Sequence, residues 1–76
     1  NNTFSIYPNP FDNVFTITSK QKGVIEVYNQ IGQILLSASI VEGLNYIESV
    51  LLDKGVYFIR ISMNNGATVC EKLTKL

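Results

Sequence analysis

The residues that could do chemistry in this chain of 76 residues are few and scattered along it. Histidine is absent, which removes Ser–His and Cys–His nucleophile pairs, histidine metal sites and the commonest general base. The carboxylates fall at spacings that form neither an acid–base pair nor a calcium loop. They are Asp12, Glu26, Glu42, Glu48, Asp53 and Glu71. The sequence therefore predicts a protein that is not an enzyme, with no catalytic residue, metal site or cofactor site.

The remaining candidates are the single cysteine and the tyrosines. Cys70 has no intramolecular disulfide partner, and a lone cysteine within a β-pattern is most often a small buried hydrophobic residue. A row of exposed aromatic rings could stack on sugars. However, the tyrosines fall on four different expected strands, and Tyr57 has the spacing of a core residue, so we expect packing rather than a binding platform. The four are Tyr7, Tyr28, Tyr46 and Tyr57.

Composition excludes several classes of protein. The chain is 46% hydrophobic and 16% charged, which argues against disorder. Six basic and six acidic residues give no basic footprint for nucleic acid. No apolar run reaches the ~18 residues of a membrane-spanning helix, and no signal-peptide pattern is present. The first residue is Asn1, so we expect residues 1–76 to be a single domain from a longer protein. The N-glycosylation pattern at residues 1–3 matches often by chance and carries no weight.

The elements that must position any site are strands. Helical periodicity is absent, and seven β-rich runs are separated by turn residues about every ten positions, which predicts a small antiparallel β-sandwich. The expected strands are residues 4–7, 14–18, 24–28, 33–39, 44–50, 56–62 and 67–75. Alternation directs the following to the core: Phe15, Ile17, Ile25, Val27, Ile34, Leu36, Ala38, Ile47, Tyr57, Ile59 and Ile61. Thr16 and Thr18 are expected on a face exposed to water.

The segments between the strands have distinct turn chemistry. Pro8 and Pro10 fix their own φ angles and push the residues before them out of the helical region, so residues 7–10 should be extended and stiff. Gly32 and Gly55 end turns in a way that suits a positive φ. The Asn65-Gly66 pair between two β-runs predicts a hairpin.

Five segments occur in an order that is more informative than any of them alone. They are Ile6-Tyr7-Pro8-Asn9-Pro10, Val27-Tyr28-Asn29, Ile31-Gly32-Gln33, Lys54-Gly55-Val56-Tyr57-Phe58-Ile59 and Glu71-Lys72-Leu73. The chain resembles, from residue 4 to 76, the type A C-terminal sorting domain of cargo proteins of the Bacteroidetes type IX secretion system. The Tyr-Pro-Asn-Pro and Lys-Gly-Val-Tyr segments are specific in combination. Ser49 departs from the expected alternation.

The resemblance implies an Ig-like sandwich at the C-terminus of a larger exported protein. Its partners would be the outer-membrane type IX translocon, a sortase-type protease that usually removes the domain, and a covalently linked upstream cargo. The cargo would cross the periplasm and reach the cell surface or the medium, without membrane insertion of this domain. The implied sorting residues are Tyr7, Pro8, Asn9, Pro10, Gly32, Gly55, Tyr57, Lys72, Leu73, Thr74, Lys75 and Leu76.

A physical mechanism can accompany this resemblance. The last run, residues 67–76, is expected to be an exposed edge whose unpaired backbone groups could receive a strand from a partner. Lys72 and Lys75 would prevent nonspecific pairing of this edge with other strands, and their positive charges could be recognised by a partner. Two alternatives from other classes remain open: an accessory carbohydrate-binding module of a secreted enzyme, and a passive spacer.

Overall fold

The computed structural model describes residues 4–76, so the N-glycosylation pattern at residues 1–3 lies outside the described residues. The described chain forms seven strands and no helix, which confirms the all-β prediction. The strands are β1 (Phe4–Tyr7), β2 (Val14–Ser19), β3 (Gly23–Tyr28), β4 (Ile34–Ile40), β5 (Gly43–Glu48), β6 (Gly55–Met63) and β7 (Thr68–Lys75).

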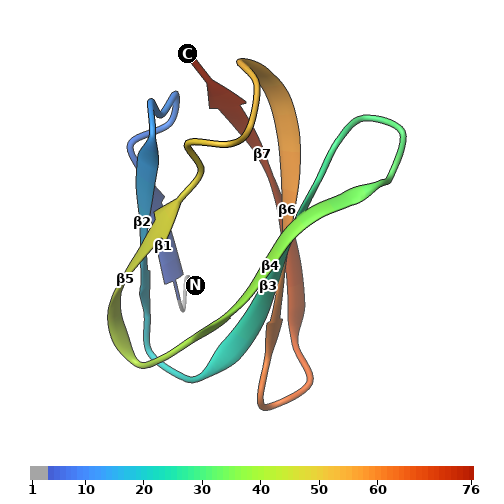
Figure 1. Cartoon of the computed structure of the whole chain (residues 1–76). Helices are drawn as coiled ribbons and strands as arrows, with labels where there is room; N and C mark the ends of the chain where they lie inside the picture. Colours follow the sequence, from blue (N-terminus) through green and yellow to red (C-terminus); the bar gives the residue numbers. More distant parts are fainter. Residues whose placement is uncertain (1–3) are drawn as a thin grey trace.

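The strands form two sheets that face each other as a sandwich (Figure 1). One sheet has the order β1-β2-β5 and the other β4-β3-β6-β7, and neighbouring strands within each sheet are antiparallel. The hairpin predicted at Asn65-Gly66 joins β6 to β7, and Gly66 has a φ of 92°. The edge strands are β1 and β5 in the smaller sheet, and β4 and β7 in the larger one.

The core lies between the sheets and follows the predicted alternation at most positions. Its buried members are Phe11, Phe15, Ile17, Ile25, Val27, Ile40, Ile47, Tyr57, Ile59, Ile61, Met63 and Leu73. Leu36 and Ala38 pack against this cluster from β4. Phe11, which precedes β2, was not predicted in the core. Its ring meets Phe15 edge-on at 5.0 Å and fills the end of the sandwich.

One predicted position in β2 and one in β4 are wrong. Thr16 is 8% exposed rather than wet, because β2 is the middle strand of its sheet and Tyr7 and Tyr46 lie beside Thr16 on the outer face. Ile34 was expected inside, but the β3–β4 register shifts at Val27/Tyr28 and places Ile34 opposite Tyr28. An extra residue in one strand moves the following side chain to the other face, and Ile34 is 54% exposed.

The two ends of the sandwich differ in what they carry. Residues 8–13, 29–33 and 49–54 connect strands at the end where Leu76 lies, and Phe4 begins β1 at the opposite end (Figure 1). We call the first of these the motif end, because four of the five sequence segments that carry the resemblance reach it.

Candidate functional site

Two segments from opposite ends of the sequence meet beside the outer edge of β7. The side-chain amide of Asn9 donates to the carbonyl oxygen of Lys72 at 3.0 Å. Its Oδ1 accepts from the N–H of Thr74 at 3.1 Å. The Asn9 amide has one donor and one acceptor group, so it pairs with β7 as a backbone peptide group of a neighbouring strand would.

Phe11 extends this contact with its backbone. Its N–H donates to the Thr74 carbonyl at 2.9 Å, and its carbonyl accepts from the N–H of Leu76 at 2.8 Å. Phe11 thus makes a short parallel bridge to Lys75. Four predicted sorting residues from the two ends of the chain are therefore brought together with Phe11, which was not predicted. We call this contact the 9–76 seam (Asn9, Phe11, Lys72, Thr74 and Leu76).

The last run, residues 67–76, is exposed along only part of its edge. β7 is an edge strand, but the seam covers its edge from Lys72 to Leu76. Backbone groups of alternate residues in an antiparallel pair point to the same side. Because Thr74 and Leu76 direct their N–H groups away from β6, Thr68 and Cys70 do so as well. The open part of the edge is therefore the stretch before the seam.

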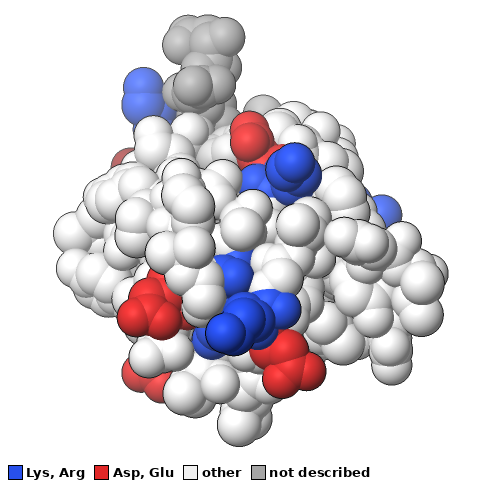
Figure 2. All heavy atoms as spheres, turned by 90° about the horizontal axis from the view of Figure 1, so that it is seen from above, with Lys and Arg blue, Asp and Glu red and all other residues white. Residues whose placement is uncertain are grey.

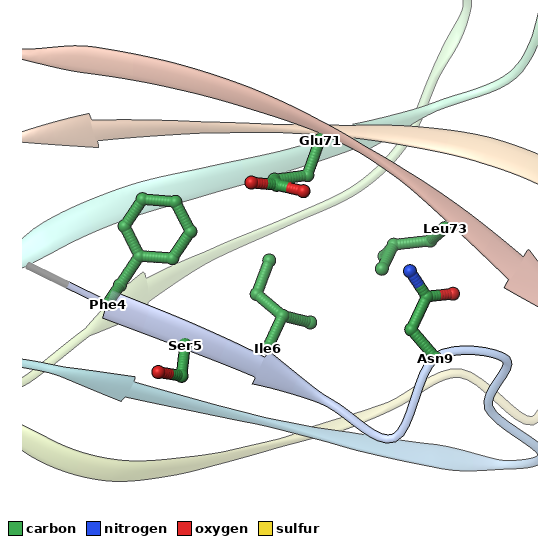
Figure 3. A pocket seen from close by; sticks show the side chains of 6 residues that line it. All are labelled: Phe4, Ser5, Ile6, Asn9, Glu71 and Leu73. Carbon is green, nitrogen blue, oxygen red and sulfur yellow. The ribbon is translucent and has the colours of Figure 1, made fainter. Parts of the chain in front are cut away.

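A cleft of about 250 Å³ lies between β1 and β7, next to the seam (Figure 3). Its lining residues are Phe4, Ser5, Ile6, Asn9, Glu71 and Leu73. In Figure 3, Glu71 and Leu73 extend from β7 towards Phe4 and Ile6 of β1. Glu71 was not among the predicted sorting residues. The sequence contained a signal for Glu71, because it is two residues from Leu73 in the same strand and its side chain therefore lies on the same face of the sheet.

A buried lysine closes the core below the seam. Lys75 is only 7% exposed, and its Nζ donates to the carbonyl oxygen of Ser49 at 2.7 Å and to Asn13 Oδ1 at 3.4 Å. The Ser49 hydroxyl donates to the Asn13 carbonyl at 2.9 Å. These contacts explain why a polar residue interrupts the alternation at Ser49. They also show that Lys75 is part of the fold rather than a protecting charge on the edge.

The middle segments of the resemblance gather around a second hollow, of about 300 Å³, lined by residues 29–31 and 54–57. Gly32 has a φ of 89°, as predicted, and its N–H donates to the Asn29 carbonyl at 3.0 Å. Gly55 also has a positive φ. The ring of Tyr57 is in the core, and its hydroxyl donates to the Asp53 carbonyl. All three residues shape the loops of the motif end.

The predicted sorting residues differ in exposure. Leu73, Tyr57 and Lys75 are buried and can act only through the fold. A partner can contact the exposed members directly, and these are Tyr7, Pro8, Asn9, Pro10, Gly32, Lys72 and Leu76. Gly55 and Thr74 are half-buried. Seen from the motif end, acidic and basic groups lie next to one another within a largely uncharged surface (Figure 2).

The outer face of the larger sheet carries the remaining titratable contacts. Arg60 pairs with Glu26 across the strands, and this hydrogen bond raises the pKa of Arg60. Cys70 is exposed, which overturns the expectation that it is buried, because it lies on the outer face of an edge strand. A hydrogen bond with its thiol raises the pKa of Tyr28.

The described residues show neither a metal centre nor a spanning helix. Among residues 4–76, His, Cys, Asp and Glu nowhere gather in a group of three that could hold a metal ion. Within the same residues, no helix has the length and apolar character needed to cross a membrane.

Comparison with known proteins gives one result. The family model for the secretion system C-terminal sorting domain matches residues 5–75. No curated protein matches the chain.

Proposed function

Because the chain belongs to the family of type IX secretion system C-terminal sorting domains, we propose that it directs a covalently linked upstream cargo protein through the type IX translocon. The cargo then reaches the outer-membrane surface or the medium. The observation that carries this proposal is the 9–76 seam. It joins the Tyr-Pro-Asn-Pro segment to the end of β7, so that both form one surface for a translocon component.

The direction of the strands supports this role. β1 begins at the end of the sandwich opposite the motif end, where the seam lies (Figure 1). We expect a cargo attached upstream of β1 to leave the seam uncovered. A translocon component can hold the motif end without displacing the cargo.

Recognition has two parts under this proposal. Lys72 and Leu76 of the seam and Tyr7 beside it are exposed, and they present a shape and a charge. The open backbone of β7 at Thr68 and Cys70 offers hydrogen bonds to an added strand. The buried residues Leu73 and Lys75 keep this surface in place.

Removal of Thr74–Leu76 does not separate recognition from folding, because it deletes seam hydrogen bonds and the buried Lys75 together. A sharper experiment fuses a reporter upstream of the chain in a type IX host and compares two lysine variants. Lys72→Glu reverses an exposed charge, and Lys75→Met removes a buried one.

We expect Lys72→Glu to reduce export of the reporter several-fold without changing the urea midpoint of the isolated chain. Lys75→Met should reduce export only as far as it lowers stability. The readouts are reporter activity in the medium and on washed cells. A wild-type fusion that stays in the periplasm contradicts the proposal. Normal export of a Lys72→Glu, Leu76→Glu double variant contradicts the role given to the seam.

Processing by a sortase-type protease belongs to the same proposal. Such a protease removes the domain after export, so the exported reporter should be shorter than the fusion by about this domain. Intact mass spectrometry of the reporter from the medium measures this. An exported reporter that retains residues 4–76 contradicts the processing step.

One observation favours a second candidate function, that of a carbohydrate-binding module. Tyr7 and Tyr46 flank Thr16 on the outer face of the smaller sheet, two strand spacings or roughly 10 Å apart. Both are exposed, at 46% and 67%. Affinity electrophoresis in soluble polysaccharides tests this. If a polysaccharide slows the migration of the wild-type chain and Tyr46→Ala abolishes this effect, the binding module is supported. If no polysaccharide slows the wild-type chain, the binding module is contradicted. A passive spacer would tolerate Lys72→Glu.

A further inference from the structure

The edge of β4 is regular and uncovered from Leu36 to Ile40, between the register shift at Ile34 and the Asn45 side-chain amide that pairs with the backbone of Val41. Its sequence, Ile34–Ile40, contains no charged residue and no proline. Natural edge strands avoid pairing with other chains by lysine, proline, shortness, a β-bulge or a covering segment. Two of the other edge strands use these devices. β1 has only four residues and is followed by Pro8, and β7 carries Lys72 and is covered in part by the seam.

The backbone of β4 presents hydrogen-bonding groups on its outer side. The N–H of Val41, just after the strand, points away from β3 and donates to Asn45 Oδ1 at 2.8 Å. Alternate residues direct their backbone groups to the same side. Ser37 and Ser39 therefore direct their N–H and C=O groups outwards, where the described chain provides no neighbouring strand.

We propose that the β4 edge is a self-association site, and that its occupant is the β4 edge of a second copy of this chain in antiparallel, two-fold symmetric pairing. The regular part of β4, residues 36–40, is centred on Ala38. With Ala38 on the two-fold axis, Ser37 of each copy exchanges backbone hydrogen bonds with Ser39 of the other. The result is one continuous sheet across the two copies.

Charge and shape both favour a second copy as the occupant. A strand with no charged side chain pairs with its own copy without like-charge repulsion. The small side chain of Ala38 suits the closest position, at the axis.

The pairing leaves the proposed sorting surface free. β4 and β7 are opposite edges of the same sheet, so association through β4 does not cover the 9–76 seam. The inference therefore does not depend on the proposed function.

Sedimentation velocity of the 76-residue chain, from about 10 µM to about 1 mM, tests the proposal. We expect the weight-average mass to rise towards that of a dimer. The double variant Ser37→Lys, Ser39→Lys opposes like charges across the axis and should weaken association about tenfold or more. The control Thr68→Lys adds a lysine to the opposite edge of the same sheet, at β7, and should leave association unchanged. Circular dichroism confirms that each variant is folded.

Charge exchange makes the test specific to β4. The double variant Ser37→Glu, Ser39→Glu should also weaken self-association. When it is mixed with the double lysine variant, heterodimers that contain one copy of each variant should form. A chain that stays monomeric at about 1 mM overturns the proposal. The proposal is also overturned if neither double variant weakens the dimer, or if Thr68→Lys disrupts it. Either result would place the interface away from β4.

Discussion

Asn9 and Thr74, 65 positions apart in the sequence, are joined by a hydrogen bond from the Thr74 N–H to Asn9 Oδ1 at 3.1 Å. The same amide group donates to the carbonyl of Lys72. A single side chain thus takes the place of a neighbouring strand at the edge of β7. The contact links the start and the end of the chain, and the stability of the seam should depend on it.

Asn9→Ala should lower the free energy of unfolding by about 1–2 kcal/mol, because it removes both hydrogen bonds to β7. Urea denaturation followed by circular dichroism measures the change. Asn64→Ala is the matched control, since Asn64 is exposed in the β6–β7 turn, where its backbone N–H donates to Lys22. Equal midpoints for Asn9→Ala and wild type would show that Asn9 does not hold the seam.

Lys75→Met should cost about 1–3 kcal/mol, because it leaves the Ser49 carbonyl without its buried donor while keeping a side chain of similar length. Lys72→Met, on the exposed face of the same strand, should change stability by no more than ~0.5 kcal/mol. Thermal and urea unfolding of the two variants provide the comparison. The account of Lys75 fails if the two variants are equally stable.

Gly23→Ala should destabilise the chain by about 1–3 kcal/mol, because a Cβ at Gly23 would lie 2.6 Å from the Ser62 backbone oxygen. Gly23 lies between β4 and β6, opposite Ile40 and Met63, so the backbone cannot withdraw without breaking both pairings. Val24→Ala, at the next and exposed position, is the control for substitution within β3. Unchanged unfolding of Gly23→Ala would mean that β6 can move aside.

Tyr57→Phe should cost about 0.5–1.5 kcal/mol, because the Asp53 carbonyl loses its donor while the ring stays in the core. The proposed sorting function gives Tyr57 no direct contact with a partner, so export of a reporter fusion should stay close to wild type. Parallel measurement of the urea midpoint and of exported reporter distinguishes the two roles. Strong loss of export with an unchanged midpoint would show that a partner reads the hydroxyl.

The sequence by itself determined the seven strands, most of the core and the glycine turns, because these depend on alternation and on φ preferences that act within a few residues. It also indicated the segments of the sorting family. It could not place Phe11 in the core, since Phe11 precedes β2 and its burial depends on Phe15 and the facing sheet. Ile34 was misassigned for a related reason: the bulge that turns it outwards arises from pairing with β3.

Only the tertiary structure decided which distant segments meet. It showed that Asn9 completes the edge of β7, that Lys75 lies inside the fold while Lys72 lies outside, and that β4 keeps an open edge. Alternation along one strand says which side a residue faces, but it does not say which strand lies beside it. That depends on how two sheets close over a shared core, which is a property of the whole chain.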